Sequence, residues 1–386
     1  MKSSKDQLLV GRRGALKLMG LSSAAMLAAG FSDVAAAEPK DLKPKLKPVI
    51  SDGRSTVTFT TGTDRKQMLY EVIKPFEGEL KAQLKKKQLI IKPNMVVTNV
   101  TLCATHVDAL RALLEYLQPI YKGQIIIAES SSQANSADGF KNYGYLDLAK
   151  DFNVKFVDLN SNEEGKPVFI LDRNLHMEEI RVSEMFMNPD NYFISLSRLK
   201  THNAVIMTGG LKNMAMGAPL FRPGNETVKQ ISYKRNMHSG GSRFLHYNMY
   251  LMAQHVRPDF TIIDGVEGME GNGPISGTPV DHRIAMAGFD VLSVDSMCAR
   301  LMDVPLENVG YLNYCAAAGM GNIDRSKIDI IGGTPEQHVK TYKMNSNIAS
   351  QMEWKDPLQL PRPGAPAQQQ PAQGQNPAQP AAPQRQ

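Results

Sequence analysis

The residues best suited to chemistry lie in one stretch, Ser197 to His202, followed closely by a second polar cluster, Gly209 to Met214. An apolar run, Tyr192 to Leu196, leads directly into the first stretch. Lysine side chains bind anions, and lysine or histidine can serve as a general base or acid when its neighbours shift its pKa. Because ligands of open α/β sheets bind beyond the carboxyl ends of the strands, we expect the functional site here.

Other apolar runs also end in polar residues, and the carboxyl ends of parallel strands meet at one edge of a sheet. We therefore expect six further residues to face Lys200 and His202 across a cleft. They are Lys92, Asn94, Glu129, Ser130, Asp264 and Asp290. For any one of them the alternative is a structural role. Asp290, for example, could simply cap the helix that follows it.

A metal site is one chemistry that these residues could support. Carboxylate and imidazole groups are ordinary ligands of divalent metals, and a metal could polarise an anionic substrate or activate water. The predicted ligands are Glu129, His202 and Asp264, with Glu270 or Asp295 as further candidates. Their spacing lacks a compact pattern such as His-x-x-x-His. A lone histidine after a strand is more often a hydrogen-bonded structural residue than a metal ligand.

An anion site is the second possibility. Three lysines could hold a phosphate or carboxylate, and backbone N–H groups of two glycine-rich stretches could complete the site. The lysines are Lys92, Lys200 and Lys212, with Arg198 nearby, and the stretches are Gly209–Gly210 and Gly271–Gly273. The alternative is that the lysines form structural ion pairs with Glu129 and Asp264. Neither stretch matches G-x-G-x-x-G, so nucleotide binding is not specifically indicated.

Both chemistries lead to one set of predicted site residues. The predicted catalytic residues are Lys200, His202 and Lys212, and the predicted substrate-binding residues are Lys92, Asn94, Ser130, Asn213 and Gly273. A polar segment, residues 221–242, is expected to be a long loop that closes over the anion as a lid, or else a solvated insertion. It carries Lys234, Arg235 and His238. The sequence has no G-x-S-x-G motif and no cysteine beside a candidate base, which disfavours nucleophilic hydrolase chemistry.

Alternating strands and helices must position these residues. Continuous apolar runs predict buried strands near residues 87–92, 124–128, 154–159, 192–196, 260–265, 284–288 and 328–332. Helices are predicted at residues 105–117 with Thr105 as N-cap, 143–152, 245–256 and 291–302. Residues 161–187 are expected to form a small β excursion. The order predicts an α/β fold with a mostly parallel sheet and helices on both faces.

The motifs occur in an order that resembles the family catalogued as domain of unknown function 362. They are Lys92-Pro93-Asn94, Glu129-Ser130, Leu199 to His202 and Leu211 to Met214, continued by Asp264-Gly265, Gly271 to Pro274, Gly288 to Asp290, and Asp295. The resemblance covers residues 89–333 and implies a layout but no reaction, because the family has no settled activity. Many relatives carry an appended ferredoxin-like segment. The three widely spaced cysteines of this chain lack its spacing, so we expect no iron–sulfur cluster from this chain.

The two ends of the sequence differ in composition from its middle. Residues 1–37 contain Arg12-Arg13, a weakly apolar segment and three alanines before an expected cleavage after Ala37, which is typical of a twin-arginine signal. This predicts a periplasmic protein that meets the twin-arginine translocase during export; an uncleaved signal would instead anchor it to the membrane. Residues 356–386, rich in Pro, Gln and Ala, are expected to be a disordered tail, which leaves residues 47–355 as a single α/β domain.

The net charge of the chain limits the class of ligand that we expect. A formal net charge of +6 is small for 386 residues and argues against a nucleic-acid-binding surface. We expect a small anionic ligand instead. The predicted function is an exported enzyme that acts on a small anionic compound with a divalent metal or a cofactor loaded in the cytoplasm. The alternative is a non-catalytic periplasmic protein that binds such a ligand, or a partner in a redox or maturation complex.

Overall fold

Nine strands form one mixed sheet in a computed structural model, which describes residues 53–132, 135–160, 164–222 and 231–357. Across the sheet the order is β13-β1-β12-β11-β7-β2-β3-β4, and β8 pairs with β7. The bounds are β1 (Ser55–Thr61), β2 (Gln88–Pro93), β3 (Ile125–Glu129), β4 (Val154–Asp158), β7 (Asn191–Thr201), β8 (Met207–Thr208), β11 (Phe260–Asn272), β12 (Ser276–Gly288) and β13 (Ile328–Gly332). From β11 to β4 all neighbours are parallel, whereas β12 is antiparallel to both of its neighbours. The predicted α/β class is confirmed.

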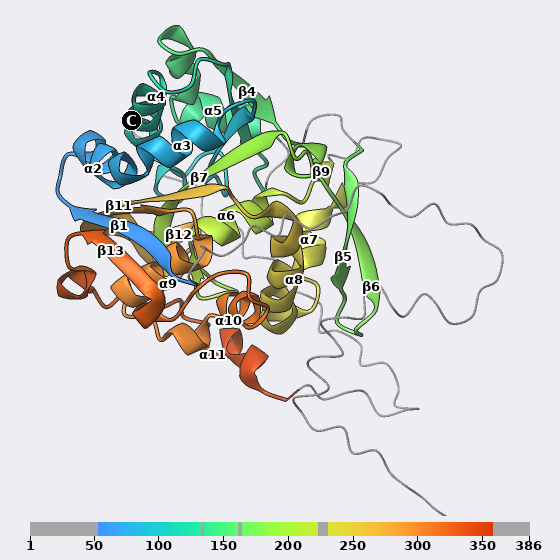
Figure 1. Ribbon diagram of the computed structural model, residues 1–386. Coiled ribbons are helices and arrows are strands. Elements are labelled where there is room, and N and C mark those ends of the chain that lie inside the picture. Colours follow the sequence, from blue (N-terminus) through green and yellow to red (C-terminus); the bar gives the residue numbers. More distant parts are fainter. Residues whose placement is uncertain (1–52, 133–134, 161–163, 223–230, 358–386) are drawn as a thin grey trace, which may run out of the picture. The chain divides into compact units, whose positions relative to one another are not determined.

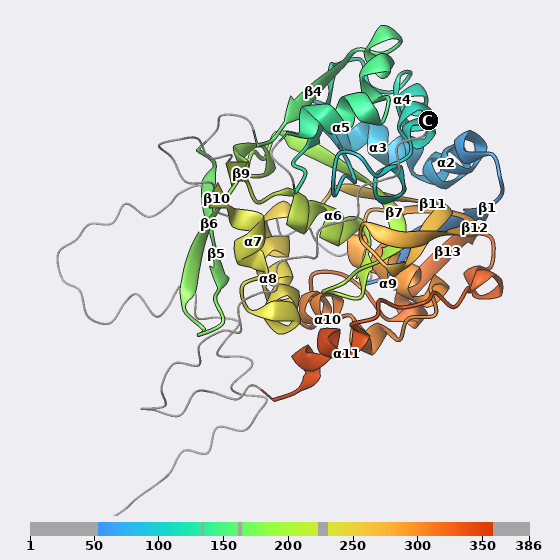
Figure 2. The same cartoon turned by 180° about the vertical axis from the view of Figure 1, so that it is seen from behind.

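Helices cover both faces of this sheet (Figures 1 and 2). One face packs against α2 (Arg65–Ile73), α3 (Glu77–Gln83), α4 (Val107–Leu117) and α5 (Ser136–Asn142). The other packs against α6 (Gly210–Gly217), α8 (Gly241–Val256), α9 (Val291–Leu301) and α10 (Gly310–Ala317). Two shorter helices are α7 (Tyr233–Met237) and α11 (Ile348–Gln351). The 3₁₀ turns are η1 (Lys74–Phe76), η2 (Thr101–Cys103), η3 (Tyr145–Lys150), η4 (Glu184–Phe186), η5 (Leu306–Asn308), η6 (Arg325–Lys327), η7 (Pro335–His338) and η8 (Glu353–Lys355).

The pleat of the central strands divides the core into two clusters. Because successive side chains of a strand point to opposite faces, Tyr192 and Ile194 of β7 pack on the α2 side. Phe193 between them packs on the α6 side. The same alternation places Leu89 and Ile91 of β2 on the α2 side. It also decides which polar groups at the strand ends can meet.

The predicted β excursion is confirmed as an antiparallel hairpin of β5 (Lys166–Leu171) and β6 (Met177–Val182). The predicted cap of α4 is wrong. His106 is the N-cap, and its Nδ1 accepts the Asp108 N–H at 3.1 Å. Thr105 Oγ1 instead accepts the Asn94 N–H and donates to the Leu196 carbonyl, so this side chain joins the end of β2 to the middle of β7.

The predicted loop over residues 221–242 is wrong for its described part. Two short strands, β9 (Phe221–Arg222) and β10 (Ile231–Ser232), pair with each other and lead into α7. Ser232 caps α7 by accepting the Arg235 N–H. Residues 223–230 lie outside the described residues. The helix predicted at 143–152 is the 3₁₀ turn η3, which follows α5.

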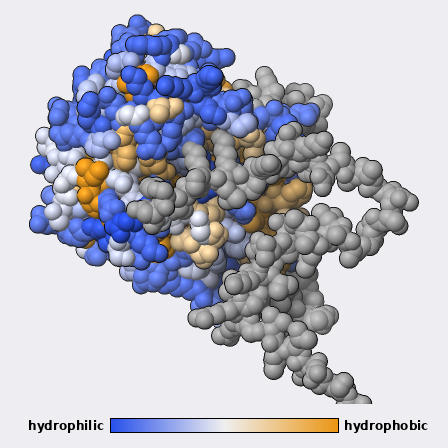
Figure 3. Space-filling view, in the orientation of Figure 1, coloured by the Kyte–Doolittle hydropathy of each residue, from blue (hydrophilic) through white to orange (hydrophobic). Residues whose placement is uncertain are grey.

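Most of the face shown in Figure 3 is covered by hydrophilic residues, with small hydrophobic areas between them. In the part of the chain that the structure describes, no helix combines the length and the apolar composition that crossing a membrane requires. The predicted signal in residues 1–37 and nearly all of the predicted tail lie outside the described residues. The signal, the tail and the domain boundaries therefore stay predictions.

Candidate functional site

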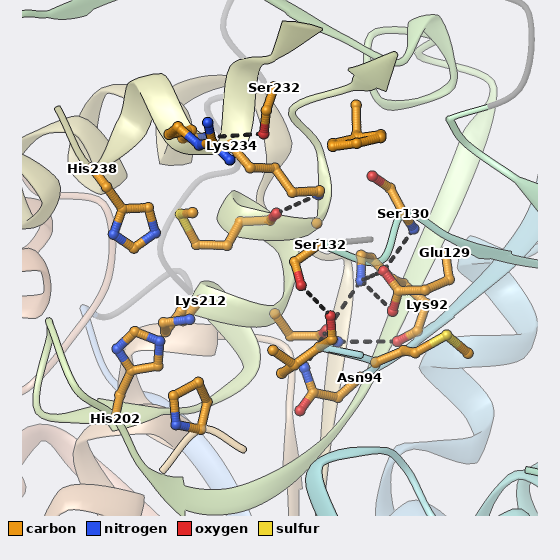
Figure 4. Close-up of a pocket in the computed structure, with 18 of the residues that line it drawn as sticks. Lys92, Asn94, Glu129, Ser130, Ser132, His202, Lys212, Ser232, Lys234 and His238 are labelled. Atoms are coloured by element: carbon orange, nitrogen blue, oxygen red, sulfur yellow. Dashed lines mark hydrogen bonds and ion pairs between the residues drawn. The ribbon is translucent and has the colours of Figure 1, made fainter. Parts of the chain in front are cut away.

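A cavity of about 540 Å³ opens beyond the ends of β2 and β3, next to α6 and α7 (Figure 4). Its polar lining comes from segments far apart in the sequence: Lys92, Asn94, Glu129, Ser130, Ser132, His202, Asn203, Lys212, Asn213, Ser232, Lys234, Arg235 and His238. The structure thus gathers the ends of β2 and β3 and the residue after β7 around one hollow. Its volume lies in the range of small-molecule sites.

A buried ion pair forms one wall of the cavity. Lys92 Nζ lies 2.7 and 2.9 Å from the two carboxylate oxygens of Glu129, and both side chains are about 1% exposed. Burial lowers the pKa of Lys92 and raises the pKa of Glu129, while their mutual attraction opposes both shifts. The pair is neutral as a whole wherever the proton resides. Lys92 therefore contributes little net charge to the cavity.

Asn213 holds α6 against the sheet beside this ion pair. Its Nδ2 donates to the Lys92 carbonyl at 3.1 Å and to Ser195 Oγ at 3.0 Å. Its Oδ1 accepts from Lys92 Nζ at 3.1 Å and from Asn94 Nδ2 at 3.2 Å. The amide of Asn213 is thus fully used by the scaffold. Asn94 Oδ1, by contrast, is buried with no hydrogen-bond partner among the described residues.

Lys212 precedes Asn213 in α6 and projects into the cavity (Figure 4). Its side chain is buried, and within the described residues no hydrogen bond or ion pair holds its ammonium group. Burial lowers the pKa of Lys212 to about 7, helped by the charges of Lys200, Lys234 and Lys92. The cavity therefore contains a lysine that is about half protonated at neutral pH.

A second lysine and two histidines surround the same space. Lys234 Nζ donates to the Met216 carbonyl at 2.7 Å, and burial lowers the pKa of Lys234 to about 7. Burial and the charge of Lys212 lower the pKa of His202 well below its usual value. The pKa of His238 is lowered by the same causes, although this residue is exposed to solvent. His202 Nδ1 accepts the Ala204 N–H at 3.0 Å, which places the proton of the neutral ring on Nε2. Both imidazoles are therefore neutral at pH 7.

The charge around the cavity is unbalanced. Among the described residues that line it, Glu129 is the one acid, and it is paired with Lys92. Lys212, Lys234 and Arg235 remain as bases. Burying a charge without a partner is costly, so this arrangement favours an anion in the cavity.

Two predicted site residues lie on the opposite face of the sheet. Lys200 points away from α6, and its Nζ donates to the Cys103 carbonyl at 2.7 Å. Asp264 also faces the α2 side, where its Oδ2 lies 3.0 Å from Arg65 Nε. Neither residue lines the cavity. Period-2 alternation along β7 and β11 separates them from Lys212.

The predicted metal set is not assembled. In the described part of the chain, no group of three or more His, Cys, Asp or Glu side chains could hold a metal ion. Glu129 and His202 line the cavity, but Asp264 pairs with Arg65 on the other side of the sheet. Asp295, a further candidate, accepts the Gly210 N–H at the start of α6, and Glu270 Oε2 accepts the Lys343 N–H.

The predicted glycine nests are already occupied. The carboxylate of Asp295 accepts the Gly210 N–H at 2.6 Å and the Leu211 N–H at 2.9 Å, so it fills the N-terminus of α6. Burial raises the pKa of Asp295 to about 7. At the other nest the Gly271 N–H donates to the Lys343 carbonyl. The Gly273 N–H donates to the Gly271 carbonyl.

Three predicted residues take structural contacts. Gly273 packs so closely on Thr201 that an added Cβ would lie 2.2 Å from the Thr201 carbonyl oxygen, and its neighbour Pro274 lines the cavity instead. Ser130 lines the cavity, with its Oγ 2.8 Å from Asn160 Oδ1. Asp290 caps α9, as the alternative interpretation held.

Lys234 and His238 line the cavity from α7 and the residue after it, whereas the sequence predicts a lid or a solvated insertion for this segment. A signal was available, because Ser232 followed by Arg235 and Met237 fits a capped short helix. Met216 and Phe221, which also line the cavity, were missed as well. Their apolar character gave no sign that they face a ligand space.

A family model described as a domain of unknown function (DUF362) matches residues 89–300. A thylakoid-associated protein of Synechocystis sp. is 24% identical over 220 residues, which are 56% of this chain. The chain spans 63% of the length of that relative.

Two solved structures share a distant likeness. The lactate racemase apoprotein from Thermoanaerobacterium thermosaccharolyticum is 13% identical with a TM-score of 0.38, and the match covers 65% of this chain and 57% of that one. A protein from Thermotoga maritima is 10% identical with a TM-score of 0.36, over 67% of this chain and 60% of that one. At these scores the likenesses carry no inference about chemistry.

Proposed function

The chain belongs to the family described as a domain of unknown function (DUF362), and on this premise we propose that it is an enzyme acting on a small anionic compound bound in the cavity beside α6 and α7. One observation carries the proposal: Lys212 and Lys234 are buried around a hollow whose described acid, Glu129, is already paired. A bound carboxylate or phosphate would balance these charges. The ligand would also raise the lowered pKa values of both lysines.

Catalysis, rather than binding alone, is supported by the protonation states around the cavity. A general acid or base works best when its pKa lies near the working pH, and Lys212 and Lys234 both have pKa values of about 7. The neutral rings of His202 and His238 lie close enough to Lys212 for its charge to lower their pKa values. Groups that can give and take a proton near neutral pH therefore lie together around the cavity.

The test is a calorimetric titration of the purified protein with inorganic phosphate and with pyruvate. We expect at least one of these anions to bind at one site per chain. Binding should weaken as the pH rises through about 7, because Lys212 and Lys234 then lose the protons that attract the anion. Lys234→Met should weaken binding about tenfold or more, which corresponds to the loss of one charge-assisted hydrogen bond.

Lys150→Met is the matched control, because Lys150 is an exposed lysine whose Nζ pairs with Asp147 outside the cavity. It should bind the anions as the wild type does. If neither anion binds to the wild type, or if the two variants lose affinity equally, the proposed site is wrong. If an anion binds at the cavity, the anion site stands, and chemical conversion of bound carboxylates then separates the enzyme from the non-catalytic binder.

Export remains a further part of the proposal. It is supported by the twin arginine and the alanines before Glu38, which lie outside the described residues. N-terminal sequencing of protein recovered from the periplasm should begin at Glu38. Full-length protein confined to the cytoplasm would contradict export. The metal set of Glu129, His202 and Asp264 is not included in the proposal, since Asp264 is committed to Arg65.

A further inference from the structure

Of the three lysines that line the cavity, Lys212 has the most available amine. Lys92 Nζ is held by Glu129 and by the Asn213 amide, and Lys234 Nζ donates to the Met216 carbonyl. Lys212 Nζ has no such partner among the described residues. It is nonetheless held in place, because the next residue, Asn213, is fixed to β2 and β7 by its amide hydrogen bonds.

We propose that Lys212 is a nucleophile that forms a Schiff base with a small compound carrying a carbonyl group beside a carboxylate. The proposal rests on the proposed function, because it names the substrate class of the same cavity. An amine buried next to other cationic groups is the environment in which lysines become nucleophilic at neutral pH. Lys234 is the cationic neighbour in the cavity wall, whereas the charge of Lys92 is balanced by Glu129.

The reaction balances without an oxidant or a reductant. The nitrogen lone pair of neutral Lys212 forms a bond to the carbonyl carbon, and the C=O π electrons move to the oxygen, which takes up a proton. The nitrogen loses one proton, giving a carbinolamine. The carbinolamine then loses its hydroxyl group as water after a second proton transfer to that oxygen. The products are an iminium ion on Lys212 and one water molecule.

The residues around Lys212 can interact with both the carbonyl group and the carboxylate of such a substrate. The Nε2–H of neutral His202 can donate a hydrogen bond to the carbonyl oxygen, since its Nδ1 accepts the Ala204 N–H. The proton that this oxygen takes up can come from the ammonium group of Lys234, whose pKa is about 7. His238, also neutral, can accept the proton that Lys212 releases. Lys234 and Arg235 can also hold the carboxylate. A neutral ketone would lack this last interaction.

Trapping with sodium borohydride tests the proposal on the full-length protein. Hydride reduces the iminium ion to a stable secondary amine, so treatment with pyruvate should add the mass of pyruvic acid less one oxygen atom. Peptide mapping should place this adduct on Lys212 at a level about tenfold or more above any exposed lysine. Acetone should give no such preference for Lys212, and inorganic phosphate should reduce the pyruvate adduct.

Lys212→Arg is the matched variant, because it retains the positive charge but not the nucleophile. It should still bind phosphate and should lose the adduct. Mapping the wild-type protein decides the question even if this variant folds poorly. If an anion binds in the calorimetric titration but native protein saturated with pyruvate carries no preferential label on Lys212, the inference is wrong and the anion site stands. If no anion binds and no adduct forms, both fail.

Discussion

At the residue scale, three consecutive side chains of α6 have separate roles. Leu211 packs in the core, Lys212 lines the cavity, and Asn213 binds the backbone of β2 and Ser195 of β7. Consecutive helical residues point about 100° apart, which makes this division possible within one turn. Placing an unpaired lysine between two structural residues costs stability that a bound anion would recover.

Replacement of this lysine should therefore stabilise the empty protein. The folded-state pKa of Lys212, about 7, lies below its ordinary value of 10.5, so between these values the unfolded chain binds more protons and stability rises with pH. Below about pH 7 the full penalty applies. We expect Lys212→Met to melt at a higher temperature than the wild type near neutral pH, with the difference shrinking toward pH 10.5.

Thermal melts of both proteins across this pH range, without added anions, provide the measurement. Lys150→Met, which removes an exposed lysine, should show no comparable trend. A Lys212→Met protein that melts lower than the wild type at every pH would mean that this lysine supports the scaffold instead.

Several site residues were predictable from the sequence, because a position at the end of an apolar strand was sufficient to predict that they lie at the cavity. Lys92 and Glu129 lie at the ends of β2 and β3, His202 follows β7, and all three line the cavity. Lys200 and Asp264 satisfied the same rule but lie on the other face. The rule locates the edge of the sheet but not the face. Because β7 runs past its apolar part to Thr201, Lys200 is still inside the strand and shares the α2 side with Ile194 and Leu196.

At the element scale, the start of α6 is fixed by a carboxylate from a neighbouring helix. Asp295 of α9 binds the first N–H groups of α6, two residues before Lys212. Close packing allows this contact, since a Cβ on Gly209 would lie 2.3 Å from Asp295 Oδ1. The glycine pair thus admits an internal anion. Sequence alone could identify an anion-binding helix start here but not which anion occupies it.

Asp295→Ala should therefore weaken both the fold and the site. Two buried N–H groups would lose their acceptor, which costs roughly 1–3 kcal/mol for each unsatisfied group. The loosened start of α6 would displace Lys212, so we expect a lower melting temperature and weaker phosphate binding. Denaturant unfolding and the calorimetric titration measure the two effects.

The control is Asp64→Ala, which removes the N-cap of α2 on the opposite face of the sheet. This variant should lose roughly 0.5–2 kcal/mol of stability without a change in anion affinity. Equal loss of affinity in the two variants would show that α6 is not specifically positioned by Asp295.

At the scale of the whole molecule, the sheet separates charged residues that make structural contacts from those that line the ligand cavity. The α2 face holds charged residues in internal contacts, such as Asp264 with Arg65 and Lys200 with the Cys103 carbonyl. The cavity and its unpaired lysine lie beside α6 on the other face. The succession of most sheet strands along the chain was predictable from the alternating apolar runs, but β1 and the order of the strands across the sheet were not. The antiparallel direction of β12 was not predicted either; it arises because β11 and β12 form a hairpin, with Asn272 paired with Ser276 at its end.

This separation predicts that Asp264→Ala lowers stability and spares the site. The change leaves Arg65 without its buried partner, which should cost roughly 1–3 kcal/mol. Phosphate affinity should match that of the wild type, the reverse of the result expected for Lys234→Met. Loss of affinity in Asp264→Ala, with a normal melting temperature, would return Asp264 to the binding site.

The two half-protonated lysines around one hollow have a consequence for how the protein responds to its surroundings. When the cavity is empty, Lys212 and Lys234 can lose protons, which reduces the repulsion between their charges. When an anion binds, the two lysines take up protons again. Ligand entry would thus consume hydrogen ions from the medium, and the heat released would vary with the buffer that supplies them. At a constant concentration of ligand, lowering the pH would therefore raise the fraction of the protein that has ligand bound.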